Sequence, residues 1–127
     1  MKIAQILLER ERLFYHGTAR SDLNFRAGQV AYFTINQKDA IAHAEMAARQ
    51  GGEPKTIEAR LSVKNPTIID DRQMHDLHFD PDRVREFLDQ GFDCAVGPYG
   101  SGEVCVFDPA AIQVSRVIPL AQMGRAA

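Results

Sequence analysis

The 127-residue sequence predicts a mixed α+β fold, and three observations support this class. Short apolar or alternating runs, bounded by glycine and polar turns, recur along the chain and are typical of β-strands. Two segments show helical periodicity between recognisable start and stop signals. No low-complexity linker, solenoid repeat or long run of one charge divides the chain. We therefore expect residues 1–127 to form a single domain of short strands with two or three short helices.

The first part of the chain is expected to contain a helix, two strands and the loop between them. Lys2 to Arg12 begins with apolar residues at helical spacing, which predicts a short helix. Leu13 to Tyr15 and Val30 to Thr34 are short apolar runs that indicate strands. Gly17 to Gln29 is polar and has glycine near both ends, so we expect a loop there.

The clearest helical signal follows these strands. Asn36 is a good N-cap, and Asp39 in the first turn suits the helix dipole. Gly51 and Gly52 end the helix. The apolar positions of this helix are Ile41, Ala44 and Ala48.

The middle of the chain returns to strand patterns. Thr56 to Val63 alternates, with Ile57, Ala59, Leu61 and Val63 on one face, which predicts a half-buried strand. Pro66 to Ile69 is expected to continue this strand after a bend.

A second helix is predicted after Asp80 and Pro81, which form an N-cap and first-turn pair, and it ends at Gly91. The residues expected on its apolar face are Val84, Phe87 and Leu88.

The last part of the chain reads as a hairpin and a final strand. Phe92 to Val96 and Glu103 to Phe107 flank the turn-rich segment Gly97 to Gly102, and Ile112 to Ile118 alternates. In the tightest hairpin register Cys94 faces Cys105. No CxxC occurs, so we expect buried, reduced thiols rather than a zinc or disulfide framework.

Composition excludes several function classes. Apolar residues make up 45% and charged residues 25% of the chain, so wholesale disorder is excluded. The net charge of −2 gives no global attraction to nucleic acid or anionic lipid. No segment reaches the roughly 20 apolar residues of a membrane span. Met1 to Leu8 is too short for a signal peptide, so we expect a soluble protein without a membrane partner.

Two polar clusters have ordinary explanations. Gly97, Gly100 and Gly102 suggest a phosphate loop, but a strand follows instead of the required helix, which favours a hairpin turn. His75 and His78 have a spacing that suits metal ligands on a helix. No third ligand has diagnostic spacing, so we expect a solvated loop and no metal.

The more informative residues are His16, Tyr32 and Glu103, each at or near the end of a predicted strand. Glu103 begins an apolar strand, shares a face with Cys105 and Phe107, and follows a glycine turn. A carboxylate at such a rim is either solvated or functional.

The order of these residues resembles a known family. FYHGT (Phe14 to Thr18), AYFT (Ala31 to Thr34) and GEVCVFDPAAI (Gly102 to Ile112) resemble the core motifs of H-Y-E type ADP-ribosyltransferases. The resemblance is strongest to the small domains in polyvalent proteins of phages and plasmids, and it extends to poly(ADP-ribose) polymerase catalytic domains. KNPTIIDD (Lys64 to Asp71) and GFDCAV (Gly91 to Val96) look like the intervening segments, so the resemblance covers most of the chain.

This resemblance implies a split β-sheet with an NAD cleft between its halves. The implied catalytic residues are Glu103, His16 and Tyr32. Glu103 would bond the ribose 2′-hydroxyl, His16 would bond the nicotinamide ribose, and Tyr32 would line the nicotinamide pocket. The backbone of Gly17 would hold the carboxamide. The implied NAD-binding residues are His16, Gly17, Thr18, Tyr32, Phe33, Thr34 and His43.

Four departures from the family pattern limit what it implies. His43 replaces a stacking tyrosine of the polymerases, and Ala40 replaces a serine that contacts the carboxamide. Only 15 residues separate His16 from Tyr32, too few for a long donor loop, so chain elongation is disfavoured. Ser101 removes the E-x-E arrangement of arginine-specific transferases.

The implied activity is NAD-dependent mono-ADP-ribosyl transfer, with NAD as substrate and no metal. A protein acceptor is favoured over nucleic acid or a small molecule. The alternatives are an NAD glycohydrolase and a catalytically silent binding module. RNA 2′-phosphotransferases share the broad fold, but their arginine-rich signature is missing. The family context implies a mobile-element protein of toxin or effector type, either cytoplasmic or delivered into a host cell without a classical signal peptide.

Overall fold

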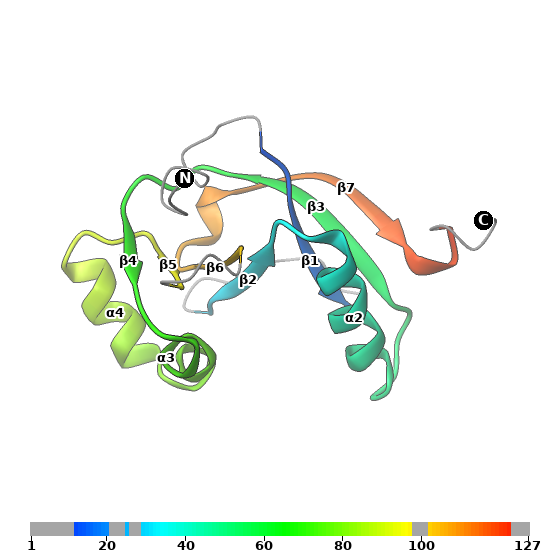
Figure 1. Ribbon diagram of the computed structural model, residues 1–127, viewed down its shortest axis with the longest axis horizontal. Helices are drawn as coiled ribbons and strands as arrows, with labels where there is room; N and C mark the ends of the chain where they lie inside the picture. Colours follow the sequence, from blue (N-terminus) through cyan, green and yellow to red (C-terminus); the bar gives the residue numbers. More distant parts are fainter. Residues whose placement is uncertain (1–11, 21–24, 26–28, 98–101, 123–127) are drawn as a thin grey trace.

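The computed structural model describes residues 12–20, 25, 29–97 and 102–122, and its elements are drawn in Figure 1. The helix expected before Arg12 and the turn around Gly100 lie outside the described residues. The strands are β1 (Phe14–Thr18), β2 (Ala31–Thr34), β3 (Lys55–Leu61), β4 (Pro66–Ile68), β5 (Cys94–Val96), β6 (Glu103–Val106) and β7 (Ile112–Pro119). The α-helices are α2 (Gln37–Ala48), α3 (Asp71–Asp76) and α4 (Pro81–Asp89). Short 3₁₀ turns are η1 (Leu77–Phe79), η2 (Pro109–Ala111) and η3 (Leu120–Gln122).

The strands form one mixed sheet in the order β4-β5-β6-β2-β1-β3-β7. Strands β4 and β5 pair in parallel, and the other neighbours pair antiparallel. The predicted α+β class is therefore confirmed. The order places β2 at the centre of the sheet, although it is the second strand of the chain, so residues from distant parts of the sequence become neighbours across it.

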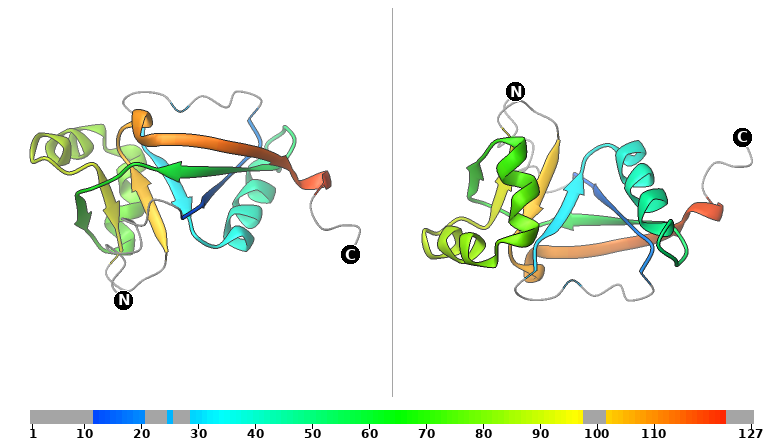
Figure 2. Two further views of the ribbon diagram at one scale, coloured as in Figure 1. Left: turned by 90° about the horizontal axis from the view of Figure 1, so that it is seen from above. Right: turned by 90° about the horizontal axis from the view of Figure 1, so that it is seen from below.

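The helices cover two separate parts of the sheet. Helix α2 packs on β1 and β3, whereas α3 and α4 lie over the half that contains β5 and β6. The view from below in Figure 2 shows β2 between α2 and α3. The centre of the sheet is therefore flanked by one helix on each side.

Alternation along the strands supplies two apolar cores. On β6, Val104 and Val106 join the core that contains Phe14 and Phe33. Cys105, between them in sequence, joins the second core under α3 and α4, which is built mainly from Ile69, Met74, Leu77, Val84 and Phe87. Because successive side chains of a strand point to opposite faces, β6 is buried on both faces.

The two predicted helix starts are confirmed. The side chain of Asn36 accepts a hydrogen bond of 2.9 Å from the backbone N–H of Lys38. The side chain of Asp80 accepts one of 3.1 Å from Arg83, and Pro81 occupies the first turn of α4. Leu88 was expected on the buried face of α4, but it is 42% exposed. The buried stripe of this short helix consists of Val84 and Phe87 alone.

Three strand expectations need correction. β1 continues through Thr18, in the segment expected to be a loop, because Thr18 pairs with Lys55 of β3. β3 is buried on both faces rather than one, since Thr56 and Glu58 are also buried. β4 does not continue β3: it lies at the far edge of the sheet and pairs with β5.

The hairpin register also differs from the expectation. Cys94 lies opposite Val106, and Ala95 lies opposite Cys105. A register shift of one residue moves side chains to the opposite face, so the two cysteines belong to different cores. Both are free and buried, as expected.

The segment that contains His75 and His78 is helical rather than a loop. Asp70 and Gln73 form a reciprocal capping box at the start of α3, and η1 follows directly. Among the described helices, none has the length and apolar composition needed to cross a membrane.

Candidate functional site

His16, Tyr32 and Glu103 lie on three neighbouring strands, β1, β2 and β6. Thr34 of β2 pairs with Glu103, so the side chains of Tyr32 and Glu103 leave the sheet on the same face. β1 and β2 are paired at Tyr15 and Thr34 alone, and beyond that position the two strands diverge towards His16 and Tyr32. The residues singled out by the sequence therefore surround the point where the sheet opens.

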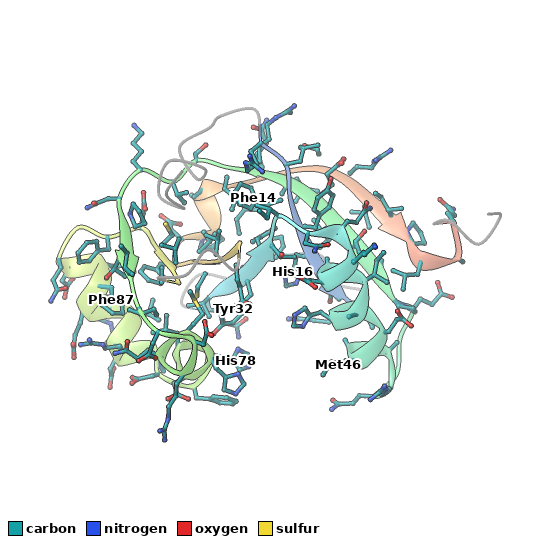
Figure 3. The ribbon with its side chains drawn as sticks, viewed as in Figure 1. Phe14, His16, Tyr32, Met46, His78 and Phe87 are labelled. Atoms are coloured by element: carbon teal, nitrogen blue, oxygen red, sulfur yellow. The ribbon has the colours of Figure 1, made fainter. Side chains whose placement is uncertain are left out.

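The imidazole of His16 has a defined orientation at this opening (Figure 3). Its Nδ1 atom lies 2.7 Å from the carbonyl oxygen of Tyr32. Because a carbonyl can only accept a hydrogen bond, Nδ1 carries the proton and donates it. The ring packs against those of Phe25 and Phe33, at centroid distances of 5.3 and 5.4 Å.

Burial lowers the pKa of His16, and the hydrogen bond to Tyr32 only partly opposes this effect. Nearby His43 and Arg20 lower the pKa further. The imidazole is consequently neutral at pH 7, with its proton on Nδ1. Nε2 then has a lone pair that accepts a hydrogen bond from a ligand hydroxyl.

Gly17 is required by the close approach of α2 to β1. A Cβ atom at this position would lie 2.0 Å from the carbonyl oxygen of Ala40 and 2.7 Å from the backbone nitrogen of Ala44. Both obstacles are backbone atoms of α2, so a side chain could be accommodated only if the helix moved. Glycine thus fixes the distance between α2 and the opening of the sheet.

Tyr32 forms the link from β2 to α3. Its hydroxyl donates a hydrogen bond of 2.8 Å to the carbonyl oxygen of Met74. Burial raises the pKa of Tyr32, so the phenol stays protonated at neutral pH. The ring packs against the core under α3 and α4, on the same face of the sheet as Glu103.

Glu103 is half-buried, and side chains of two helices act on it. Burial is the main effect, and it raises the pKa of Glu103. His43 of α2 and His75 of α3 lower this pKa, while Asp71 of α3 and Asp39 of α2 raise it. The carboxyl group therefore lies where the two helices face each other.

His43 connects the parts of this site. It is exposed on α2, and its charge acts on both His16 and Glu103. A single residue can influence both groups only if it lies near the opening, so α2 presents His43 to the same region as the three strands.

Three other residues implied to bind NAD have structural contacts. The hydroxyl of Thr18 accepts a hydrogen bond from the backbone of Arg20, and that of Thr34 accepts one from Asn36. Phe33 is 1% exposed in the core on the opposite face. Thr34 holds the turn into α2 through this hydrogen bond, and Phe33 supports the ring of His16.

Asp39, Asp71 and His75 were missed as members of this cluster. Asp39 and Asp71 lie in the first turns of α2 and α3. The signal that could have found Asp71 and His75 is the capping box at Asp70, which marks the start of a helix where we expected a loop.

A separate cavity of about 850 Å³ lies beside the end of α2. Ala19, Arg20, Met46, Gln50 and Lys55 are among its lining residues. It includes none of the residues that the sequence implicated, and Lys55 donates a hydrogen bond of 2.9 Å to the carbonyl oxygen of Arg20 across it.

Within the described residues, no group of three or more His, Cys, Asp or Glu side chains is placed to hold a metal ion. Comparison with known proteins found no matching family model, no matching curated protein and no matching solved structure.

Proposed function

We propose that this protein is an NAD-dependent mono-ADP-ribosyltransferase with an ADP-ribosyltransferase fold. The observation that carries the proposal is the convergence of His16, Tyr32 and Glu103 on adjacent strands at the point where β1 and β2 diverge. These residues are separated by up to 87 positions in the chain, so their convergence is a property of the fold.

His16 supports the binding of a ribose. Its Nδ1 proton is committed to the carbonyl oxygen of Tyr32, so Nε2 is an acceptor with a fixed direction. A ribose hydroxyl is a donor of the required kind. The resemblance assigns the nicotinamide carboxamide to the backbone of neighbouring Gly17, whose missing side chain is required by the close approach of α2.

Glu103 supports the chemistry. Cleavage of the nicotinamide glycosidic bond develops positive charge on the ribose, as in glycosidase transition states. An ionised carboxylate beside this charge stabilises the transition state more than the ground state, because the charge is absent from NAD's ribose before the bond weakens. The bond to C1′ breaks, nicotinamide leaves with the electron pair, and an acceptor nucleophile forms the new bond to C1′.

His43 and Ala40 define how nicotinamide is held. Ala40 is 1% exposed and lies against Gly17, so it offers no hydrogen bond to the carboxamide. His43, one helical turn further along α2, can stack on the ring opposite Tyr32. The nicotinamide contacts therefore come from one imidazole, one phenol ring and the strand backbone.

The test is incubation of the purified protein with NAD labelled in the adenosine moiety, with and without cell lysate. We expect nicotinamide release and transfer of label to protein. Release without labelled protein, RNA or small molecule would establish a glycohydrolase instead. NAD binding by calorimetry without any turnover would establish a silent binding module. The control is Glu45→Gln, which removes an exposed carboxylate of α2 and should leave release unchanged.

A further inference from the structure

The surface beside the proposed site carries an exposed aromatic cluster, which we call the aromatic rim and define as His75, His78 and Phe79. Phe79 is 72% exposed, the highest value among the large apolar side chains of the described residues. It ends η1, where a polar residue would serve the fold equally well. An exposed phenylalanine in this position contributes nothing to either core.

The rings of the aromatic rim form a path from solvent to the proposed site. The Phe79 centroid lies 4.8 Å from that of His78 and 6.0 Å from that of His75. The His78 ring lies 6.5 Å from the ring of Tyr32. Figure 3 shows Tyr32 and His78 near each other at the open centre of the molecule. His75 also acts electrostatically on Glu103, so the rim borders the carboxylate.

The segment that carries the aromatic rim is rich in negative charge. Between positions 70 and 82 the chain has five aspartates and a single arginine, Arg72. Asp70 and Asp80 cap helices, and Asp82 pairs with Arg85. The side chains of Asp71 and Asp76 make no hydrogen bond or ion pair within the described residues. Their charges are therefore available to a partner.

We propose that the aromatic rim docks a lysine- or arginine-rich segment of the acceptor protein, an inference that rests on the proposed transferase activity. Exposed aromatic rings bind ammonium and guanidinium groups through their faces. Neighbouring carboxylates attract the same groups and orient them. A segment held here lies next to Tyr32 and Glu103, where the acceptor nucleophile must enter.

The same charges disfavour a nucleic acid at this surface. Phosphates would be placed beside Asp71 and Asp76, which repel them, and binding of nucleic acid depends on neutralising phosphates with lysine or arginine. An acidic protein segment is excluded for the same reason. A basic segment is the occupant whose charge complements the rim.

The experiment measures binding of a fluorescein-labelled oligoarginine peptide to the full chain by anisotropy. An oligoglutamate peptide of equal length and single-stranded DNA serve as probes of the other classes. We expect binding of the oligoarginine peptide that weakens as salt is raised, because exposed charges are screened. Phe79→Ala and Asp76→Asn should each weaken it about threefold, the size of one exposed cation–aromatic or charge contact.

Matched controls separate the rim from general surface effects. Val114→Ala removes an exposed apolar side chain of β7, and Asp89→Asn removes an exposed carboxylate at the end of α4. Both should leave peptide binding unchanged. Equal weakening by these controls, or tighter binding of DNA than of the oligoarginine peptide, would overturn the proposal.

Nicotinamide release by the wild-type protein is measured in parallel in cell lysate, without the labelled peptide, because transfer requires an acceptor. Release together with no binding of the oligoarginine peptide would reject the docking surface and leave the enzyme standing. Binding that depends on Phe79 and Asp76 without any release would support the surface and reject the transferase.

Discussion

Glu58 and Glu103 are two carboxylates on the same side of one sheet, and their surroundings differ. Glu58 on β3 is buried, and its carboxylate lies 3.3 Å from the guanidinium of Arg116 on the adjacent β7. Glu103 on β6 is half-buried between α2 and α3, where two histidines and two aspartates act on it. A carboxylate next to a permanent cation has its charge balanced by the fold. Glu103 instead is acted on by histidines and aspartates of both α2 and α3.

Burial of a carboxylate does not by itself mark a functional site. Glu58 is the more deeply buried of the two, yet its partner and position are those of a cross-strand ion pair. What distinguishes Glu103 is its location at the opening of the sheet beside Tyr32. Variants of the two carboxylates and of their surroundings test whether they differ in function as they differ in environment.

The largest expected effect is that of Glu103→Gln on catalysis. The change removes the charge and keeps the shape, so kcat for nicotinamide release should fall about 10²-fold or more, roughly 3 kcal/mol. NAD affinity should change much less, because the stabilised charge appears only as the bond breaks. An assay of nicotinamide release measures kcat, and calorimetry measures the affinity for NAD. Turnover close to wild type in a folded variant would remove Glu103 from the mechanism.

Gly17→Ala tests whether the position of α2 matters to the site. The added Cβ meets backbone atoms of Ala40 and Ala44, so α2 must shift, and we expect destabilisation of about 1 to 3 kcal/mol. The shift also moves His43 away from Glu103, so NAD binding should weaken. Urea unfolding and calorimetry measure the two effects.

Gly51→Ala is the control for this residue change. A Cβ at Gly51 would have no atom within 4 Å, although the φ of 113° there carries its own strain. This variant should lose some stability through its backbone and keep wild-type affinity for NAD. A Gly17 variant with wild-type stability would contradict the close contact between β1 and α2.

The pH profile should distinguish Glu103 from an ordinary surface carboxylate. Burial raises the pKa of Glu103 above 4.5, so nicotinamide release should fall as pH drops through that raised pKa. Below it the loss approaches about tenfold per pH unit, because the ionised fraction falls by that factor. The groups that act on Glu103 from the two helices are His43, Asp39, His75 and Asp71. A flat profile down to the ordinary glutamate range would contradict this.

The same pKa shift has an opposite consequence for stability. The folded protein holds the Glu103 proton more tightly than the unfolded chain does, so protonation of Glu103 stabilises the folded state. This contribution to the free energy of unfolding is complete below the pKa of the unfolded chain. It is lost as pH rises through the raised folded pKa. Activity and this part of the stability therefore change in opposite directions with pH. Glu103→Gln should remove both dependences and should not lower the melting temperature at neutral pH.

The smallest expected effect is that of Glu58→Gln on stability. It removes the ion pair with Arg116, whose side chain is 65% exposed, so the loss of stability should be about 1 kcal/mol. Nicotinamide release per folded molecule should stay at the wild-type level. A rate defect comparable with that of Glu103→Gln would show that the sheet, rather than the opening, governs catalysis. Thermal unfolding and the nicotinamide assay provide both measurements.

Local signals predicted the helices α2 and α4 well, because a cap is an interaction between residues two or three apart. Asn36 and Asp80 make the hydrogen bonds that their positions indicate. Helix α3 was missed because its six residues carry little periodicity, and its capping box at Asp70 and Gln73 was the only clear signal. With α3 read as a loop, the contribution of Asp71 and His75 to the site could not be foreseen.

Strand pairing was less predictable than strand existence. The hairpin register was wrong by one position, so Cys94 and Cys105 lie on opposite faces of the sheet instead of facing each other. Pro66 to Ile69 was expected to continue the strand Thr56 to Val63 after a bend, but β4 pairs with β5 at the far edge of the sheet. Register and strand order depend on cross-strand packing and on contacts far apart in sequence, and neither leaves a local pattern.

The sequence by itself determined most of the strand segments, the helices α2 and α4 with their N-caps, the alternation that buries Val104 and Val106, and the order of His16, Tyr32 and Glu103. These depend on backbone preferences, short-range hydrogen bonds and alternation, all of which act within a few residues. Only the tertiary structure decided that β2 lies between β1 and β6, that the sheet opens beside His16, and that α2 and α3 both face Glu103. Those outcomes arise from pairing between distant strands and from the close approach of α2 to Gly17. The free energy of folding that favours them comes from packing many segments together, so no single segment encodes it.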